Sequence, residues 1–254
     1  MKKNIHPLLC AFNAGLAALL FVVSPLRADD MMAVPNPSAQ TLKLHYLDPD
    51  AISAASVLAP PPLADSAEQA ADLDEVRAVH HAATSNDIAV AYSQKKFNMF
   101  TFTPAIGAFF QPGKFPVTEA FMHKVQKDAE TITDTGKNFF KRPRPYVTDP
   151  SLANGKLEKS FSYPSGHSTE SMVLALVLAE LFPEQQDAII AEARSIGWHR
   201  VEIARHYPTD IYAGRVLAKA IVKQFQKNHA FETGLAAAKA EIEAVCATNA
   251  VMAK

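Results

Sequence analysis

The segment from Lys137 to Pro145 places several basic side chains within a few positions of one another. Prolines on both sides of Arg144 restrict its backbone, so the guanidinium is carried on a rigid support. A planar guanidinium held in this way suits two-pronged binding of phosphate oxygens, and Lys137 adds a second positive charge. The alternative is a solvated basic turn at a helix C-terminus, where cations are favoured anyway.

A second segment, Ser162–Ser168, contains a proline and a glycine that predict a tight turn entering an apolar helix. The amide N–H groups of Ser165, Gly166 and His167 would then be free at the helix N-terminus, which is an anion-binding arrangement. Ser165 adds a hydroxyl donor, and His167 can give or take a proton. The alternative is a plain turn in which Ser165 or Ser168 caps the helix.

The third segment, Trp198–Asp210, combines a guanidinium, an imidazole and a carboxylate. His206 and Asp210 are four residues apart, so on a continuous helix the carboxylate would orient the imidazole. Pro208 interrupts that helix, which weakens the spacing argument. Arg200 and His206 lie about 120° apart around an ideal helix, so their convergence requires a bend. The alternative is a surface helix carrying ordinary charges.

The N-terminus has the features of an export signal. Lys2 and Lys3 precede an apolar run from Leu8 to Val23, and a small residue, Ala28, precedes a polar segment. These features predict a signal peptide over residues 1–28 that is cleaved after Ala28, and hence a periplasmic protein. An uncleaved membrane anchor is the alternative. No other segment is long and apolar enough to span a bilayer, so no membrane span is expected after cleavage.

The remainder is predicted to be all-α: an extended arm over residues 29–64, rich in proline and alanine, and one helical domain over residues 65–254. The stretch 167–182 is apolar on all sides, which is typical of the central helix of a bundle. The expected helices are Asp65–Tyr92, Val117–Phe140, His167–Phe182, Asp187–His206, Ile211–Phe225 and Phe231–Ala247.

Composition excludes several classes of protein. With 254 residues, of which 48% are hydrophobic and 20% charged, the chain has ample material for a core. A formal net charge of −1 offers no basic footprint, so no nucleic-acid binding is expected. Two cysteines can form neither a disulfide scaffold nor a cysteine-rich zinc site.

Taken in order, the three segments resemble the three-part motif of the phosphatidic acid phosphatase type 2 superfamily, which includes bacterial acid phosphatases and vanadium haloperoxidases. Within it, the chain is most similar to the bacterial class A non-specific acid phosphatases. The likeness extends to Pro60-Pro61-Pro62 before a helix and to Ser-Tyr-Pro-Ser-Gly-His at residues 162–167. It implies a helical bundle of the acid phosphatase/vanadium haloperoxidase type that acts on small phosphomonoesters and leaves assembly into a homo-oligomer open.

The resemblance also implies roles for the residues. His206 would attack phosphorus to form a phosphohistidine, Asp210 would orient it, and His167 would act as acid and then as base. The implied phosphate-binding residues are Lys137, Arg144, Ser165, Gly166 and Arg200. Positive side chains supply the charge, so no metal or other cofactor is expected; the adjacent His80 and His81 face different sides of a helix.

The third motif departs from the family pattern, because it begins His199-Arg200 where Ser-Arg is usual. His199 could replace that serine as a donor, lie aside, or alter the substrate or pH preference. Two other functions stay open. A vanadium haloperoxidase would hold vanadate with the same residues and use His206 as its ligand. A non-catalytic phosphate- or phospholipid-binding relic would keep the anion site without turnover.

Overall fold

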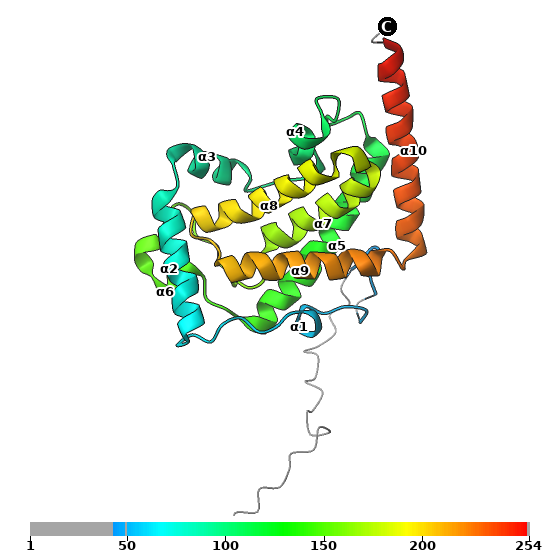
Figure 1. Ribbon diagram of the computed structural model, residues 1–254. Coiled ribbons are helices and arrows are strands. Elements are labelled where there is room, and N and C mark those ends of the chain that lie inside the picture. The colour runs from blue at the N-terminus through cyan, green and yellow to red at the C-terminus, as the bar shows by residue number, and fades with distance from the viewer. Residues whose placement is uncertain (1–42, 49, 253–254) are drawn as a thin grey trace, which may run out of the picture. The chain divides into compact units, whose positions relative to one another are not determined.

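The computed structural model describes residues 43–48 and 50–252, and every regular element in that part of the chain is a helix (Figure 1). The predicted all-α class is therefore confirmed. The described residues belong to one compact unit, Thr41–Lys254. The predicted signal peptide and the first part of the predicted arm lie outside the described residues, and the boundary at residue 65 stays a prediction.

In the described part of the chain, seven helices are at least two turns long: α2 (Ala67–Ala82), α3 (Ser85–Ser93), α5 (Pro116–Phe140), α7 (Gly166–Leu181), α8 (Gln186–Glu202), α9 (Pro208–Phe225) and α10 (His229–Met252). Six described elements are single turns: α1 (Ala54–Val57), α4 (Thr103–Ile106), α6 (Pro145–Thr148) and the 3-10 turns η2 (Met99–Phe102), η3 (Pro150–Leu152) and η4 (Pro183–Gln185). Among the described residues, no helix is both long and apolar enough to cross a membrane.

Helix α7 is the centre of the bundle, as its all-apolar sequence predicts. It packs against α5, α8 and α9, which surround it in Figure 1. Between Met172 and Phe182 its sequence has a single charged residue, Glu180, and most of its side chains are buried. A helix without a polar face is most stable when other helices cover it on all sides, because its apolar side chains are then removed from water.

Glycine lets α9 approach the N-terminus of α7 closely. A Cβ atom on Gly214 would lie 2.9 Å from the carbonyl oxygen of Ser165 and 2.9 Å from Cβ of Ser168. The close approach allows the N–H of Ser165 to donate to the carbonyl of Asp210 at 3.1 Å. A backbone hydrogen bond thereby holds the second predicted segment, which contains Ser165, against the third, which contains Asp210.

The helix predicted over Asp65–Tyr92 is in fact two helices, α2 and α3. Thr84 accepts a hydrogen bond from the N–H of Asp87, and the Asp87 carboxylate accepts one from the N–H of Thr84 at 2.8 Å. This capping box satisfies amides at a new helix start, so the chain turns at Thr84 although the apolar spacing continues.

The helix predicted from Ile211 begins three residues earlier, at Pro208, and the interruption lies before that proline. Proline is well suited to the first helical position, since an N–H at that position would have no partner within the helix and its absence costs nothing. The chain reverses at Ala204, which has a left-handed φ of 51°. This turn supplies the bend that the spacing of Arg200 and His206 requires.

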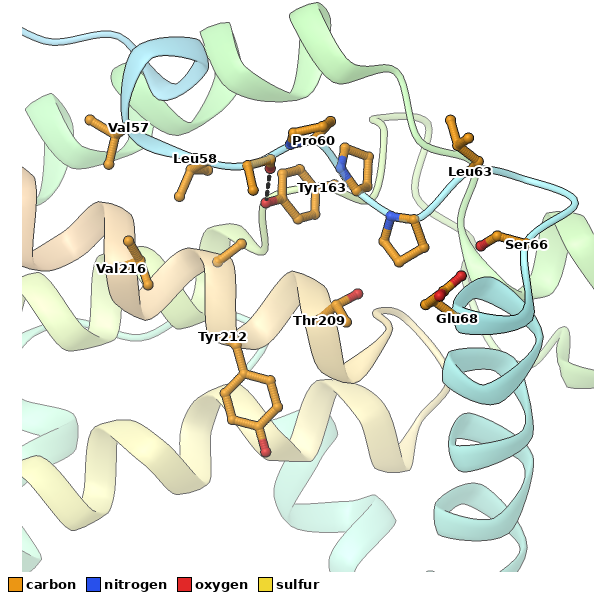
Figure 2. Close-up of a pocket in the computed structure, with 14 residues that line it drawn as sticks. Val57, Leu58, Pro60, Leu63, Ser66, Glu68, Tyr163, Thr209, Tyr212 and Val216 are labelled. Atoms are coloured by element: carbon orange, nitrogen blue, oxygen red, sulfur yellow. Dashed lines mark hydrogen bonds between the residues drawn. The ribbon is translucent and has the colours of Figure 1, made fainter.

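Tyr163 holds the segment before α2 against the body of the protein. Its hydroxyl donates to the carbonyl of Ala59 at 2.7 Å, as the dashed line in Figure 2 shows. Between this proline-rich segment and α9 lies an apolar groove of about 660 Å³, to which Tyr212 and Val216 contribute (Figure 2). None of the predicted site residues lines the groove.

Candidate active site

His206 lies at the centre of the site, in the turn between α8 and α9, and only 1% of its surface is exposed. Its Nδ1 is 3.2 Å from Oδ2 of Asp210, and its Nε2 is 3.2 Å from Nη1 of Arg144. Because the guanidinium can only donate, Nε2 is the acceptor and the proton resides on Nδ1, facing Asp210. Burial and the charge of Arg144 lower the pKa of His206 well below its usual range. The imidazole is therefore neutral and oriented.

Asp210 is fixed by groups that the sequence analysis did not single out. Ser162 donates to its Oδ2 at 2.5 Å, the N–H of Tyr207 donates to the same oxygen at 2.9 Å, and Arg142 donates to Oδ1 at 2.6 Å. Ser162 and Arg142 lie inside the predicted motifs, and Arg142 precedes Arg144 by two residues. In an extended segment that spacing places two side chains on the same side, which was the available signal.

Arg142 also ties α2 to the site. Its buried guanidinium donates to Oδ2 of Asp72 at 2.6 Å and lies 3.9 Å above the centre of the Tyr207 ring. A buried cation between two carboxylates keeps its charge, and the two aspartates raise its pKa against the opposing effect of burial. The network couples the position of Asp210 to the packing of α2.

Arg144 and Arg200 come together from different elements. Arg144 is extended at the N-cap of α6, and its Nε and Nη1 donate to the carbonyls of Ser160 and Arg205 at 2.8 and 2.9 Å. Arg200, in the last turn of α8, donates to the carbonyl of Ala91 at 3.2 Å. Their side chains are 2% and 3% exposed.

Glu158 bridges these two arginines and is not among the residues that the sequence predicts for the site. Its Oε2 is 2.6 Å from Nη2 of Arg144, and its Oε1 is 3.2 Å from Nη2 of Arg200. Its position 42 residues before Arg200, in a segment without helical periodicity, offered no local signal.

Lys137 enters from the last turn of α5 and lies beside the start of α7. Its Nζ would be 3.4 Å from a Cβ atom on Gly166. Burial and the neighbouring charge of Arg144 lower the pKa of Lys137. Glycine at residue 166 therefore leaves room for the ammonium group against the helix N-terminus.

Ser165 is the N-cap of α7, and its Oγ accepts the N–H of Ser168 at 3.3 Å. The prediction that its own N–H is free is wrong, because that N–H donates to the carbonyl of Asp210 at 3.1 Å. The first amides of α7, those of Gly166 and His167, have no carbonyl within their own helix and remain suited to an anion.

His167 is the second residue of α7 and packs against Phe97, with 5.3 Å between ring centres. Burial, together with the charge of Arg200, lowers the pKa of His167 to about 3. Its Nε2 is buried and has no hydrogen-bond partner among the described residues. An unpaired buried nitrogen is costly, so its presence beside the cations Arg200 and Lys137 points to a ligand that completes the site.

His199, which departs from the family pattern, lies 2.7 Å through its Nδ1 from Oε1 of Gln94 at the end of α3. Burial lowers its pKa. That His199 alters the substrate or pH preference of the protein stays a prediction. Among the described residues, no group of three or more histidine, cysteine or acidic side chains is arranged to hold a metal ion.

Comparison with known proteins finds one matching family model and several similar phosphatases. The family model described as the PAP2 superfamily matches residues 129–229, a range that contains all eight predicted site residues. A non-specific acid phosphatase of Providencia stuartii is 30% identical over 95% of this chain and 98% of its own length. An acid phosphatase of Zymomonas mobilis is 27% identical over 73% of this chain and 74% of its own length.

One solved structure is similar at lower identity. It is a transmembrane PAP2-type phosphatidylglycerolphosphate phosphatase from Bacillus subtilis, with a TM-score of 0.47 and 20% identity over 68% of this chain and 89% of its own.

Proposed function

Since the chain belongs to the non-specific acid phosphatases of the PAP2 superfamily and is a phosphomonoester hydrolase, we propose that it acts through a phosphohistidine on His206. The observation that carries this mechanism is the neutral, buried imidazole of His206 between Asp210 and Arg144. Asp210 fixes the tautomer that leaves the lone pair on Nε2, which is the state a nucleophile needs.

The phosphoryl group binds among the positive side chains of Lys137, Arg144 and Arg200 and the first amides of α7. Three cations with low exposure, placed before substrate arrives, stabilise the negative charge on the equatorial oxygens during transfer. Ser165 supports this site as the cap of α7, with its hydroxyl free to donate.

In the first step, Nε2 of His206 forms a bond to phosphorus as the bond from phosphorus to the ester oxygen breaks. His167 gives its proton to the leaving alkoxide. The negative charge of the bound phosphate ester, among cations that otherwise lower the pKa of His167, raises that pKa and keeps the proton in place.

In the second step, His167 takes a proton from water as the water oxygen bonds to phosphorus and the nitrogen–phosphorus bond breaks. Inorganic phosphate then leaves, and His206 returns to its neutral form. The substrates that fit this chemistry are small phosphomonoesters, since the residues of the site bind the phosphoryl group itself.

The proposed location is the periplasm, on the basis of the predicted signal peptide over residues 1–28. If the signal is cleaved after Ala28, the exported protein begins at Asp29, which N-terminal sequencing of a periplasmic fraction would reveal. Assembly into a homo-oligomer stays a prediction.

Replacement of the nucleophile tests the mechanism. We expect His206→Ala to fold and to lose at least about a thousandfold in kcat for p-nitrophenyl phosphate, because no covalent intermediate can form. Acid quenching of the wild-type reaction with labelled substrate should trap phosphate on the protein, and the variant should trap none.

The matched control is His123→Ala, since His123 is exposed on α5 and away from the site; its kcat should be unchanged. A His206→Ala protein that keeps activity within about tenfold of the wild type would contradict the assignment of the nucleophile.

A further inference from the structure

The carboxylate of Glu158 forms ion pairs with the same guanidinium groups that would bind a phosphoryl group. One oxygen is 2.6 Å from Nη2 of Arg144, and the other is 3.2 Å from Nη2 of Arg200. A carboxylate and a phosphate present pairs of oxygens to arginine in the same two-pronged way. Neither Nη2 group can serve both anions fully at once.

Glu158 is also the most accessible member of this cluster. Its side chain is 32% exposed, against 2% for Arg144 and 3% for Arg200. The carboxylate is therefore the member of this cluster that contacts solvent, whereas the guanidinium groups are buried.

The backbone of Glu158 is held in place by α6. The hydroxyl of Tyr146 accepts the N–H of Glu158 at 3.1 Å and donates to the carbonyl of Glu158 at 2.8 Å. Tyr146 follows Arg144 by two residues, so the element that carries the arginine also sets the position of the carboxylate. The backbone of Glu158 is therefore held independently of the ion pairs that its side chain makes.

We propose that Glu158 is an internal competitor for the phosphate site: its carboxylate pairs Arg144 and Arg200 in the free enzyme and is displaced by the phosphoryl group of the substrate. The proposal deepens the proposed function, because it rests on these arginines binding phosphate. It makes Glu158 a determinant of substrate affinity, with the buried arginines kept paired and in position until substrate arrives.

Displacement couples phosphate binding to protons. The titratable and charged groups facing Glu158 are Arg144, Arg200, His206, His167 and Lys137. Burial alone would raise the pKa of Glu158, but the charges of Arg144 and Arg200 outweigh it and hold that pKa at about 2.

Once phosphate takes those cations, the pKa of the displaced carboxyl group returns toward about 4.3. The complex then holds more protons than the free enzyme between these two pKa values, so lowering the pH through this window favours binding. His167 also gains a proton when an anion binds, so only the difference between the wild type and a Glu158 variant isolates this contribution.

The test is the dissociation constant of inorganic phosphate for the full mature protein, measured by calorimetry from pH 3 to pH 6. We expect Glu158→Gln to bind phosphate about tenfold more tightly than the wild type at pH 6, because the neutral amide releases both arginines. The advantage should shrink toward pH 3, where the displaced carboxyl group of the wild type is protonated. Glu184→Gln, exposed in the turn η4 that follows α7, should match the wild type throughout.

Equal or weaker phosphate binding by Glu158→Gln at every pH would overturn the proposal, since the carboxylate would then organise the arginines and not compete for them. If that variant fails to fold, Glu158→Asp replaces it. The shorter side chain keeps its charge but cannot span both arginines, so phosphate should again bind more tightly than in the wild type.

Because the measurement needs no turnover, it separates this proposal from the proposed mechanism. Tighter binding in a protein without phosphatase activity would contradict only the mechanism, and normal turnover with unchanged binding would contradict only the role of Glu158.

Discussion

At the scale of single residues, Glu170 shows how burial changes the chemistry of a carboxyl group. It lies one turn after Gly166 on α7, and both its Oε1 and Nζ of Lys137 lie within 3.4 Å of the Cβ position of that glycine. Gln126 donates to its other oxygen at 3.2 Å. Burial outweighs this hydrogen bond and raises the pKa of Glu170 to about 7.

This shift makes stability depend on pH. The folded state holds a proton on Glu170 between its ordinary pKa and about 7, where the unfolded state does not, so stability falls as the pH rises through that window. Glu170→Gln removes the loss, and we expect it to stabilise the protein by about 1–3 kcal/mol at pH 7.5 and by much less at pH 4.5. Urea unfolding at the two pH values measures this.

The exposed Glu184→Gln is the control, with no expected change at either pH. A gain for Glu170→Gln of the same size at pH 4.5 and pH 7.5 would mean that packing, and not ionisation, accounts for it.

At the scale of elements, the site depends on how closely three helices approach one another. The N-terminus of α7 meets α9 at Gly214, and α8 meets the same turn at Gly197, where a Cβ atom would lie 3.2 Å from Oγ of Ser168. These two glycines let the helix that carries the cap, Ser165, lie against the helix that carries Asp210. The geometry of His206 is thus a consequence of helix packing.

Gly214→Ala tests this contact. The added methyl group would lie 2.9 Å from a backbone oxygen of α7, which cannot move without shifting the helix. We expect a loss of about 1–3 kcal/mol in the free energy of unfolding, and a fall in kcat/KM because Ser165 and Asp210 are forced apart. Thermal unfolding and steady-state kinetics measure the two effects.

Lys219→Ala, on the exposed side of the same helix, is the control and should change stability by less than about 0.5 kcal/mol. If Gly214→Ala were as stable and active as the control, the close approach of α7 and α9 would not matter to the site.

At the scale of the whole molecule, a buried carboxylate fastens the start of the described chain to the bundle. Asp128 on α5 accepts the N–H groups of His45 and Tyr46 at 2.8 Å each, and its Oδ1 lies 2.9 Å from Nδ1 of His45. Tyr46 then packs among Phe121, Phe225 and Phe231, which belong to three helices or their ends. The anchor therefore joins segments that are 83 residues apart.

Asp128→Ala should release that anchor. Two backbone donors lose their partner at a buried position, and we expect the free energy of unfolding to fall by about 2–4 kcal/mol. Limited proteolysis should then cut near residues 43–48 under conditions in which the wild type is intact. Glu130→Ala on the same helix removes only an exposed ion pair with Lys127, so it should cost less than about 1 kcal/mol. Equal proteolysis of the wild type and Asp128→Ala would contradict the anchor.

The sequence by itself determined the features that depend on local chemistry. The apolar run after His167 predicts a central helix, and α7 is that helix. A helix without a polar face is stable only where neighbouring helices bury it on all sides. The prolines around Arg144 predict a non-helical support, and Arg144 is extended there, because proline restricts its own φ and its neighbour's conformation. The family motif likewise consists of residue types at set spacings, so it can be recognised without the structure.

Only the tertiary structure decided which distant groups meet. Glu158 reaches Arg200 across 42 residues, Asp128 reaches His45 across 83, and the left-handed turn at Ala204 brings Arg200 and His206 to one place. No helical or strand period encodes such contacts. They arise because helices that bury their apolar faces together fix the positions of every side chain between them, including polar groups for which the local sequence offers no partner.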